Sequence, residues 1–595
     1  MIGLTINGIA AQAPEDATIM EAAELVGIRI PSLCRYQKIH AIGACRICVV
    51  EVEGARNLQA SCVVKVHEGM VVHTNSKRVR DARKLVYDLI ISDHPRDCMA
   101  CSRNQTCELQ QLGFDLGVTE QHLHGQLKEC YLDVSPAITR DTTKCVLCRR
   151  CVTECRDIQG VGAISAQNRG FNSVVAPPME LPLDATNCSM CGQCTTVCPT
   201  GALTETSHSE RVWEALSDPD RRVVVQTAPA VRVALGEPFG IPFGESVTGR
   251  MASALRAMGF DDVFDTDWGA DLTIMEEGTE LLHRLVDSVS GGSAVLPMIT
   301  SCSPGWIKHC EHAWPQDLAH LSSCKSPHMM QGAMVKSYYA ERLGVDPRSL
   351  YVVSVMPCTA KKYECQRPEM MRDGIADVDA VLTTRELSRM IKTAGIDFAN
   401  LPDGVFDSPM GISTGAADIF GVTGGVMEAA LRTVYVLVTG RRPPFENFHV
   451  EPIMGFEQVK EAKITFENVL PKFAALEGRS IRVAVTSGLE GADIMMSQVH
   501  DGTSPYTFIE VMGCPGGCVN GGGQPRTTDE NVRKLRAQAL YREDEGKKMR
   551  MSHENPAVQQ IYAEYLGEPC GERSHHLLHT TYVPRGEFNE LLREA

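Results

Sequence analysis

The same spacing of cysteines, Cys-x2-Cys-x2-Cys-x3-Cys, occurs twice within residues 145–198. The first run consists of Cys145, Cys148, Cys151 and Cys155, and the second of Cys188, Cys191, Cys194 and Cys198. Thiolates are ligands for soft metals, and clustered cysteines indicate metal sites. Two unrelated zinc sites are the alternative, and the duplication disfavours them. The repeat therefore predicts that this part of the chain folds around two metal clusters.

The repeat resembles the two-cluster ferredoxins of bacteria, in which the fourth cysteine of each run ligates the other cluster. The resemblance implies one [4Fe–4S] cluster held by Cys145, Cys148, Cys151 and Cys198. It implies a second held by Cys188, Cys191, Cys194 and Cys155. The first run departs from the pattern at one position, because Arg156 stands where proline is usual.

The start of the chain, MIGLTINGIA, reads as a strand and a turn and lacks the features of a signal peptide. No apolar stretch reaches the roughly 18 residues of a membrane span, so no span is expected. Without an export signal, the 24 cysteines face a reducing compartment, where structural disulfides are rare. We therefore expect a cytoplasmic protein whose cysteines are metal ligands or buried thiols.

The charge of the chain bears on its partners. It has 74 acidic and 58 basic residues, a formal net charge of −16, which argues against nucleic acid and anionic membranes as partners. Its 595 residues suggest about three to five domains. The hydrophobic content of 43% is sufficient for packed cores.

Residues 1–78 are predicted to form a small β-rich domain. Leu4–Ile6 reads as a strand, Asn7-Gly8 as a hairpin turn, and a helix should start after Thr18. The four cysteines here, Cys34, Cys45, Cys48 and Cys62, resemble those of plant-type [2Fe–2S] ferredoxins, although the first gap is longer. Zinc is the alternative. The run from Cys45 directly into a strand favours a β-grasp ferredoxin domain with a [2Fe–2S] cluster.

Residues 79–135 are predicted to hold a further [4Fe–4S] cluster. The segment 78–92 is helical by pattern, with Val79, Ala82, Leu85, Val86, Leu89 and Ile90 on one face. It leads to His94, Cys98, Cys101 and Cys107. A histidine near cysteines is often a surface residue. A cubane needs four ligands and only three thiols are present, so we expect His94 to be the fourth.

After a two-cluster domain at 136–210, residues 220–525 change in character. Strand and helical segments alternate over 222–227, 251–258, 294–300, 329–343, 351–356, 380–382, 384–394, 426–439 and 481–487. This predicts an α/β domain with ligands at the carboxyl ends of strands. Residues 526–595 read as helical and charged. Their run from His575 to His579 indicates packing or hydrogen bonding rather than a metal site.

Three stretches of the α/β domain combine cysteine with proline or glycine. They are Thr300–Trp306, Met356–Lys362 and Met512–Pro525. The glycines of the last allow the backbone to reach positive φ and to pass close to a bulky group, although a zinc knuckle or a tight turn would also use them. Together Cys302, Cys358, Cys514 and Cys518 can hold one more cubane.

These stretches closely resemble the [FeFe]-hydrogenases, and the resemblance covers essentially the whole chain. It is closest to multi-cluster catalytic subunits of NAD(P)-linked complexes, among them electron-bifurcating ones. It implies an α+β multidomain fold with a large α/β H-cluster domain and a helical small-subunit-like segment that includes Arg550–Pro556. It also implies an H-cluster, which is a [4Fe–4S] cubane joined to a diiron subcluster with CO, cyanide and azadithiolate.

The resemblance assigns roles around the H-cluster. Cys518 is implied as the bridging thiolate, and Lys361 as a hydrogen-bond donor to cyanide. Ala228, Pro229 and Ala230 would contribute to a second cyanide pocket, and Met356 and Met512 would pack against the diiron unit. A proton path would run through Ser322, Glu277, Glu280 and Arg284. Glu277 and Glu280 are three residues apart, so both can lie on one helix face.

One departure from the family concerns Cys302-Ser303, where two adjacent cysteines are usual. The first of that pair relays protons and the second ligates the cubane. Counting along the motif places the ligand at Ser303, whereas the affinity of sulfur for iron favours Cys302 as the ligand and Ser303 as the relay. The sequence does not decide between the two, and on the preference of iron for sulfur we expect Cys302 to be the cubane ligand.

The resemblance further implies that H2 and protons are the substrates, and that electrons pass through three further [4Fe–4S] clusters and one [2Fe–2S] cluster. The partners would be an NAD(P)-binding flavoprotein and ferredoxin-like subunits of a hetero-oligomer, with ferredoxin as a further candidate. Two alternatives are a pure electron-transfer subunit, like the iron–sulfur subunit of respiratory complex I, and an H2 sensor or assembly protein. The stretches around Cys358 and Cys514 argue against the first, and Lys361 with the glutamate pair argues against the second.

Overall fold

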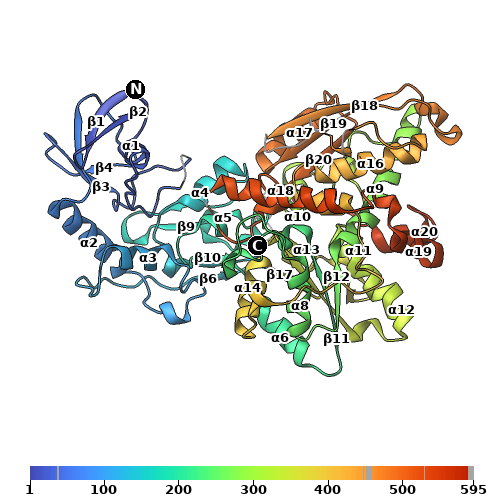
Figure 1. Ribbon diagram of the computed structural model, residues 1–595, viewed down its shortest axis with the longest axis horizontal. Helices are drawn as coiled ribbons and strands as arrows, with labels where there is room; N and C mark the ends of the chain where they lie inside the picture. The colour runs from blue at the N-terminus through green and yellow to red at the C-terminus, as the bar shows by residue number, and fades with distance from the viewer. Residues whose placement is uncertain (37–38, 446–447, 451–457, 528, 587–595) are drawn as a thin grey trace. The chain divides into compact units, whose positions relative to one another are not determined.

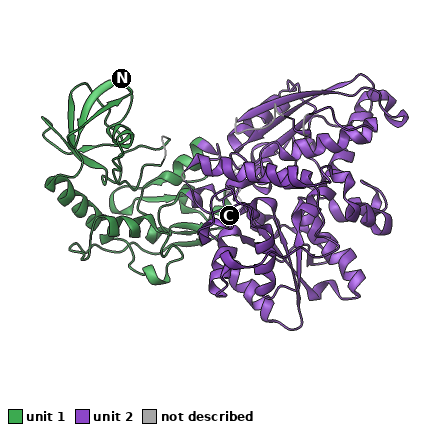
Figure 2. Cartoon of the chain, in the orientation of Figure 1, with its two compact units in different colours: residues 1–157, 162–186, 197–204 green, residues 158–161, 187–196, 205–595 purple. Residues whose placement is uncertain are grey.

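The computed structural model describes residues 1–36, 39–445, 448–450, 458–527 and 529–586. The chain divides into two units, coloured green and purple in Figure 2. The first contains residues 1–157, 162–186 and 197–204, and the second contains 158–161, 187–196 and 205–595. Residues 528 and 587–595 of the predicted C-terminal segment lie outside the described residues.

The first unit begins with a five-stranded sheet in the order β2-β1-β5-β3-β4. Its strands are β1 (Ile2–Ile6), β2 (Ile9–Ala13), β3 (Val49–Val52), β4 (Gln59–Ala60) and β5 (Met70–His73). Asn7 and Gly8 join β1 to β2 with positive φ, as the predicted hairpin turn requires. The strand predicted after Cys48 is confirmed as β3.

A capping box starts the first helix, α1 (Ile19–Leu25). The Thr18 side chain accepts a hydrogen bond from the backbone N–H of Glu21, and the Glu21 carboxylate accepts one from the backbone N–H of Thr18. Two of the donors that every helix leaves unpaired at its N-terminus are thereby satisfied. The predicted helix start is confirmed.

The buried face of α2 (Lys77–Ser92) matches the predicted one only in part, because Val86 and Ile90 do pack against the core as partly buried residues. Val79, Arg83 and Tyr87 are buried, whereas Leu85 and Leu89 are 56% and 54% exposed. The Arg83 guanidinium donates to the Val49 carbonyl (2.8 Å), and the Tyr87 hydroxyl donates to the Leu109 carbonyl (3.2 Å). Two long polar-tipped side chains therefore share the packed face with apolar ones, because their tips find backbone partners there.

The rest of the first unit consists of short elements between cysteine-containing loops. They are α3 (Glu108–Asp115), β6 (Leu132–Val134), β7 (Ile138–Asp141), α4 (Arg150–Thr153), β8 (Ser165–Gln167), β9 (Val174–Ala176) and β10 (Leu203–Glu205). Strands β10, β7 and β6 form one sheet, and β8 pairs with β9. In Figure 1 these elements run from blue to teal.

The second unit contains a parallel four-stranded sheet in the order β12-β11-β14-β17. Its strands are β11 (Arg222–Thr227), β12 (Asp262–Asp265), β14 (Leu350–Met356) and β17 (Ala380–Thr383). The chain begins in β11, moves to one side for β12 and then to the other side for β14. The carboxyl ends of β11 and β14 therefore flank a topological switch point, where α/β sheets bind ligands.

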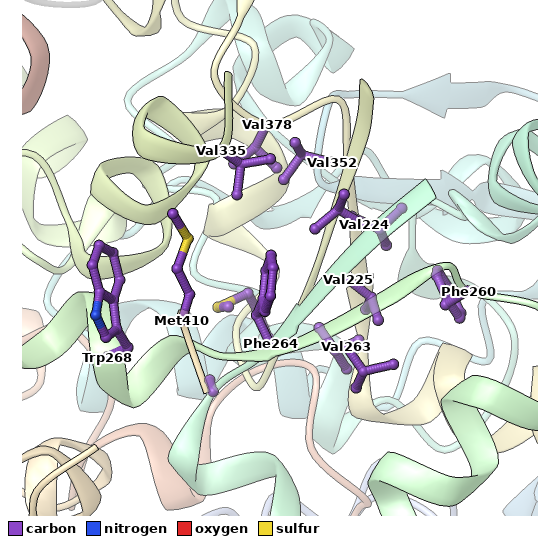
Figure 3. Close-up of a cluster of buried hydrophobic side chains, with 14 of the residues drawn as sticks. Val224, Val225, Phe260, Val263, Phe264, Trp268, Val335, Val352, Val378 and Met410 are labelled. Atoms are coloured by element: carbon purple, nitrogen blue, oxygen red, sulfur yellow. The ribbon is translucent and has the colours of Figure 1, made fainter. Parts of the chain in front are cut away.

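Branched and aromatic side chains from this sheet form a large core. Figure 3 shows Val225 and Phe264 of neighbouring strands among the residues of this cluster, which also includes Trp268 of α9 (Thr266–Val289). Phe264 is 0% exposed and Trp268 is 1% exposed. Strands buried on both faces read as apolar runs, as Val223–Val225 do in β11.

A second sheet has the order β13-β20-β19-β18. It consists of β13 (Met298–Ile299), β18 (Val459–Thr465), β19 (Ser480–Ser487) and β20 (Phe508–Met512), and β18 alone runs antiparallel to its neighbour. Of the predicted segment 294–300, only Met298 and Ile299 form a strand. The other predicted segments of this unit lie on helices or strands.

The α-helices of the second unit before the C-terminal segment are α5 (Gln193–Val197), α6 (Ser209–Ser217), α7 (Pro229–Arg232), α8 (Thr248–Ala257), α9 (Thr266–Val289), α10 (Pro304–Ala313), α11 (Pro327–Met334), α12 (Ala340–Leu343), α13 (Ala360–Glu364), α14 (Thr384–Thr393), α15 (Gly415–Asp418), α16 (Gly425–Thr439) and α17 (Leu489–His500). Arg232 of α7 is buried between Asp265 and Asp418 (2.6 and 3.3 Å). This network fixes the start of α9, the helix that carries Glu277 and Glu280.

The C-terminal segment contains α18 (Glu530–Gly546), α19 (Pro556–Ile561) and α20 (Glu572–Leu578). Buried ion pairs attach it to the rest of the unit. Arg432 of α16 pairs with Asp544 (2.9 Å), and Arg536 of α18 makes two hydrogen bonds to Glu237 (2.7 and 2.6 Å). No helix among the described residues is long and apolar enough to cross a membrane.

Replacing Arg536 by alanine should destabilise this attachment. Arg536 is 1% exposed, and its removal leaves the nearly buried Glu237 carboxylate without its partner. Breaking a buried pair from one side costs about 3–5 kcal/mol. Thermal unfolding should show the loss, and Lys534→Ala, an exposed position on the same helix, should stay within about 0.5 kcal/mol. Equal stability of the two variants would contradict this role of the pair.

Candidate catalytic and iron–sulfur sites

The cysteines of the three predicted stretches gather beyond the carboxyl ends of strands. Cys358 follows β14, Cys302 follows β13, and Cys514 and Cys518 follow β20. Cys358 and Cys514 interact through their thiols, which lowers the pKa of Cys358 and raises that of Cys514. Burial raises the pKa of Cys518 to about 12, and the charge of Cys358 adds to the rise. The donor set is thus sulfur-rich and enclosed, as a soft metal cluster requires.

Glycines let the last stretch pack against the loop of Cys358 and against the second ferredoxin-like run. A Cβ on Gly521 would lie 2.2 Å from the Pro357 carbonyl oxygen, and one on Gly522 would lie 2.3 Å from that of Cys191. The sequence predicted that the glycines allow close passage to a bulky group. What they adjoin here is the backbone of the neighbouring cysteine loops, and no larger residue would fit.

Cys302 and Ser303 lie in different surroundings. The Ser303 hydroxyl accepts a hydrogen bond from the backbone N–H of Gly513 (3.1 Å), next to Cys514. Burial raises the pKa of the Cys302 thiol, and the carboxyl of Glu277 adds to the rise. The serine is therefore beside the loop of Cys514, and the cysteine is beside the first glutamate of the predicted proton path.

Lys361 is held in place by two acceptors. Its Nζ donates to the Cys302 carbonyl (2.9 Å) and to Glu364 Oε2 (2.8 Å). Glu364 also lies 2.7 Å from His328 Nε2. The sequence analysis missed Glu364 and His328. Glu364 had a usable signal, because a carboxylate three residues after a lysine on a helix lies on the same face. His328 had none.

The predicted proton-path residues form a connected set on α9 and the segment 322–323. Glu277 is 1% exposed, its Oε2 has no hydrogen-bond partner among the described residues, and burial raises its pKa to about 8. The Ser322 hydroxyl donates to Glu280 Oε2 (2.8 Å) and also interacts with Glu277. Arg284 lies 2.6 Å from Glu280 Oε1. The set therefore leads from beside Cys302 to Arg284, which is 17% exposed.

The remaining predicted cofactor contacts lie at the same strand ends. Met356 and Met512 are the last residues of β14 and β20, and each is 3% exposed. Ala228 donates through its N–H to the Val355 carbonyl (3.0 Å), and the Ala230 carbonyl accepts from Gln524 (2.7 Å). With Pro229 at the first position of α7, this places Ala228–Ala230 at the switch point between β11 and β14.

The four cysteines of the N-terminal domain come together in the first unit. Cys48 and Cys62 have their sulfurs 3.4 Å apart, and Cys34 and Cys45 interact through their side chains. The N–H of Leu33 donates to Cys45 Sγ (3.4 Å). Backbone donors aimed at cysteine sulfur are typical of an iron–sulfur site, where they stabilise the thiolates.

His94 has the features of a ligand and not of a surface residue. It is largely buried, which lowers its pKa, and its Nδ1 has no hydrogen-bond partner among the described residues. A buried polar atom without a partner is costly, and a metal ion would satisfy it. Of the three cysteines predicted with it, Cys98 is exposed, while Cys101 and Cys107 are partly buried.

One pocket is lined by the cysteines predicted to hold the first cluster of the repeat. Its lining includes Cys145, Cys148, Cys151 and Cys198. Loops of the other cysteine sets adjoin it. The Cys148 carbonyl lies 2.9 Å from His40 Nε2, and the Pro199 carbonyl accepts from the N–H of Glu108 (2.9 Å), next to Cys107. Of the second predicted set, Cys188, Cys191 and Cys194 belong to the second unit, and Cys155 belongs to the first.

Five family descriptions match the chain. "Iron only hydrogenase large subunit, C-terminal domain" matches residues 221–522, and "Iron hydrogenase small subunit" matches 530–585. "2Fe-2S iron-sulfur cluster binding domain" matches 1–77, "NADH-ubiquinone oxidoreductase-G iron-sulfur binding region" 83–122, and "4Fe-4S dicluster domain" 144–202. The match at 221–522 does not favour a pure electron-transfer subunit.

Similar proteins match over nearly the full length. The chain is 50% identical to the NADP-reducing hydrogenase subunit HndD of Solidesulfovibrio fructosivorans, over 98% of this chain and 99% of the relative. It is 40% identical to iron hydrogenase 1 of Clostridium pasteurianum, over 97% of this chain and 99% of the relative. A solved structure of [FeFe]-hydrogenase HydA1 from Chlamydomonas reinhardtii has 44% identity and a TM-score of 0.58, covering 64% of this chain and all of that one.

These matches agree with the gathering of cysteines at the strand ends, and they do not favour a sensor or an assembly protein. The predicted fold class is confirmed, with ferredoxin-like iron–sulfur domains, an α/β H-cluster domain and a small-subunit-like C-terminus. The chain belongs to the [FeFe]-hydrogenase large-subunit family. It interconverts H2 with protons and electrons, and its iron–sulfur domains relay the electrons.

Proposed function

We propose that this chain is the H2-interconverting subunit of a hetero-oligomer that exchanges electrons with NADP(H). The observation that carries the proposal is the convergence of Cys358, Cys514 and Cys518 at the ends of parallel strands, with Cys302 beside the buried Glu277. An H-cluster bound there would supply the open iron position at which H2 is split or formed. The described residues fit it, because thiols gather there, one of them buried and the others partly buried.

Cys358, Cys514, Cys518 and Ser303 would hold the cubane, with Cys518 as its link to the diiron unit. The contact between the Ser303 hydroxyl and the N–H beside Cys514 supports this set. Cys302 would then exchange a proton with Glu277, which the electrostatic contact between the two supports. The proposal departs from the ligand that thiolate affinity favours and follows the counting along the motif. Lys361 would direct its ammonium to a cyanide ligand.

Protons would move between Cys302 and the surface through Glu277, Ser322 and Glu280, with Arg284 at the outer end. Burial raises the pKa of Glu277 to about 8, so the carboxyl can both accept and release a proton near neutral pH. Ser322 adjoins both glutamates and can pass a proton by rotating its hydroxyl. Arg284 would position Glu280 at the outer end.

Electrons would enter or leave the cubane at Cys191. Its backbone contacts Gly522, and a Cβ on Gly305 of α10 would lie 3.6 Å from the Cys191 Cβ. The relay would comprise three further [4Fe–4S] clusters and one [2Fe–2S] cluster. In the first unit, the pocket of Cys145 adjoins both His40 and the loop of Cys107, which would give the relay two outlets.

The partners proposed for these outlets are an NAD(P)-binding flavoprotein and ferredoxin-like subunits, with ferredoxin as a further electron carrier. A relative that matches over 98% of this chain is named "NADP-reducing hydrogenase subunit HndD", which supports NADP over NAD. Nucleic acid and membranes are not proposed as partners. A cytoplasmic location stays a prediction from the sequence.

Infrared and activity measurements on the matured full chain test the proposal. We expect CO and cyanide stretching bands and H2 evolution from a reduced dye. NADP+ reduction by H2 should require the added flavoprotein subunit, because we propose that the flavoprotein binds the nucleotide. If the chain shows the bands but does not turn over H2, the proposed hydrogenase activity is wrong. If the chain alone reduces NADP+, the proposed flavoprotein partner is wrong.

His94→Ala should remove one cluster and spare the catalytic centre. The variant lacks the fourth ligand of the predicted cubane of Cys98, Cys101 and Cys107, so we expect iron content to fall or a three-iron signal to appear in electron paramagnetic resonance. Dye-linked H2 evolution should persist. His67→Ala, an exposed histidine of the same unit, is the control and should keep all iron. Unchanged iron in His94→Ala would exclude the ligand role.

A further inference from the structure

The histidine run of the C-terminal segment ends in a buried histidine, His579, and both of its ring nitrogens have side-chain partners. His579 follows α20 and is 7% exposed. Its Nε2 lies 3.1 Å from Glu276 Oε2, and its Nδ1 lies 2.8 Å from Ser323 Oγ. A backbone bridge between His579 and Cys324 fixes the ring against the segment that contains Ser322.

Glu276 orients this imidazole. Its carboxylate also accepts hydrogen bonds from the backbone N–H of Cys570 (2.7 Å) and from the Tyr562 hydroxyl. With Nε2 donating to the carboxylate, Nδ1 is the nitrogen left to take up a proton on the Ser323 side. The Cys570 thiol donates to the Glu276 carbonyl (3.4 Å), so it serves a hydrogen bond and not a metal ion.

Glu280, the outer glutamate of the proposed proton path, is close to this histidine. The N–H of Ser323 donates to Glu280 Oε2 (3.2 Å). A carboxylate oxygen of Glu280, a ring nitrogen of His579 and Cys324 Sγ all lie within 4.8 Å of one another. One water molecule can bridge polar atoms at such a separation and carry a proton between them.

On its other side His579 meets a histidine that solvent reaches. The rings of His575 and His579 are stacked, with centroids 4.4 Å apart and an angle of 11° between their planes. His575 is exposed, and His576 beside it is exposed and has no such stacking among the described residues. The ionisable groups around the pair are Glu276, Glu277, Glu280, Arg284, Cys324 and Cys570.

We propose that the C-terminal segment provides a second proton branch, from solvent at His575 through His579 to Glu280. The branch rests on the proposed path through Glu280 and joins it there. In the direction of H2 formation, the His575 imidazole takes one proton from solvent and releases one through bridging water to Nδ1 of His579, and His579 gives one proton to the Glu280 carboxylate. No electron moves in these steps. Glu280 would then exchange protons with solvent at two places, one beside Arg284 and one at the histidine pair.

Chemical rescue tests the branch. In the matured full chain at low buffer concentration, His575→Ala should lower dye-driven H2 evolution several-fold, and added imidazole should restore it, because the vacated site is open to solvent. His576→Ala is the matched control and should change neither the rate nor its response to imidazole. His579→Gln should also lower the rate, without rescue, because imidazole cannot enter a buried site.

Wild-type rates in both His575→Ala and His579→Gln would overturn the branch, and so would a loss in His575→Ala that imidazole does not restore. Glu280→Gln separates this failure from failure of the path itself. If Glu280→Gln is inactive while both histidine variants work normally, the path holds and the branch is wrong. If Glu280→Gln keeps full activity, the path fails and the branch fails with it.

Discussion

Replacing Cys302 by alanine should leave the iron content of the matured protein unchanged and lower H2 turnover by about 10²–10⁴-fold. The reason is that Cys302 lies beside Glu277 and would pass the proton between that carboxyl and the active centre, while Ser303 faces the loop of Cys514. Iron analysis, electron paramagnetic resonance and a dye-linked assay on one preparation give the three readouts.

Ser303 supplies the reciprocal test. Ser303→Ala removes the oxygen that would complete the cubane, so we expect iron loss or a three-iron cluster, with activity lost as a consequence. Ser303→Cys should retain a four-iron cubane, since thiolate is the better ligand for iron. Cys310→Ala, at a buried cysteine of α10 outside the site, is the control for losing a thiol. An intact cubane in Ser303→Ala together with a damaged one in Cys302→Ala would reverse the assignment.

The order of the two residues along the chain could not decide between them. The affinity of thiolate for iron favours Cys302 as the ligand, whereas the position along the family motif favours Ser303. What separates Cys302 from Ser303 is the partner that each meets in the fold, Glu277 on α9 and Gly513 after β20. These partners are far away in sequence, so no local pattern identifies them.

Local signals did predict much of the fold. The Asn7-Gly8 turn and the Thr18 cap depend on residues within one turn of chain, and both are present as expected. The predicted buried face of α2 was wrong at Leu85 and Leu89. Apolar periodicity gives no weight to Arg83 and Tyr87, whose tips bond backbone carbonyls of other segments. A pattern based on hydrophobicity fails where long polar side chains do the packing.

The same limit applies around the proton path. The spacing of Glu277 and Glu280 indicated a shared helix face, but not which face was buried. Glu276, their neighbour, points instead to His579 from the C-terminal segment. Since adjacent helix positions point about 100° apart, three glutamates within five residues serve different surroundings. The sequence run at 575–579 was correctly expected to make hydrogen bonds, but its partner could not be named.

Glu277→Gln and Glu280→Gln should each lower H2 turnover by about 10²–10⁴-fold while all clusters remain. An amide cannot pass a proton as a carboxyl can, and Gln preserves the size of the side chain. Asp287→Asn, an exposed acid in the last turn of α9, is the control and should keep wild-type activity. Full activity in both glutamate variants, with iron content confirmed, would remove the pair from the path.

The pH dependence of stability gives an independent check on Glu277. Burial raises its pKa in the folded protein from 4.5 to about 8, so folding favours the protonated form. The stability that this group contributes is complete below its unfolded pKa and is lost as pH rises towards 8. Glu277→Gln has no proton to lose there, so its stability relative to the wild type should grow between pH 4.5 and 8. A constant difference across that range would show that Glu277 does not stay protonated in the folded protein near neutral pH, and its part in the path would have to be given up.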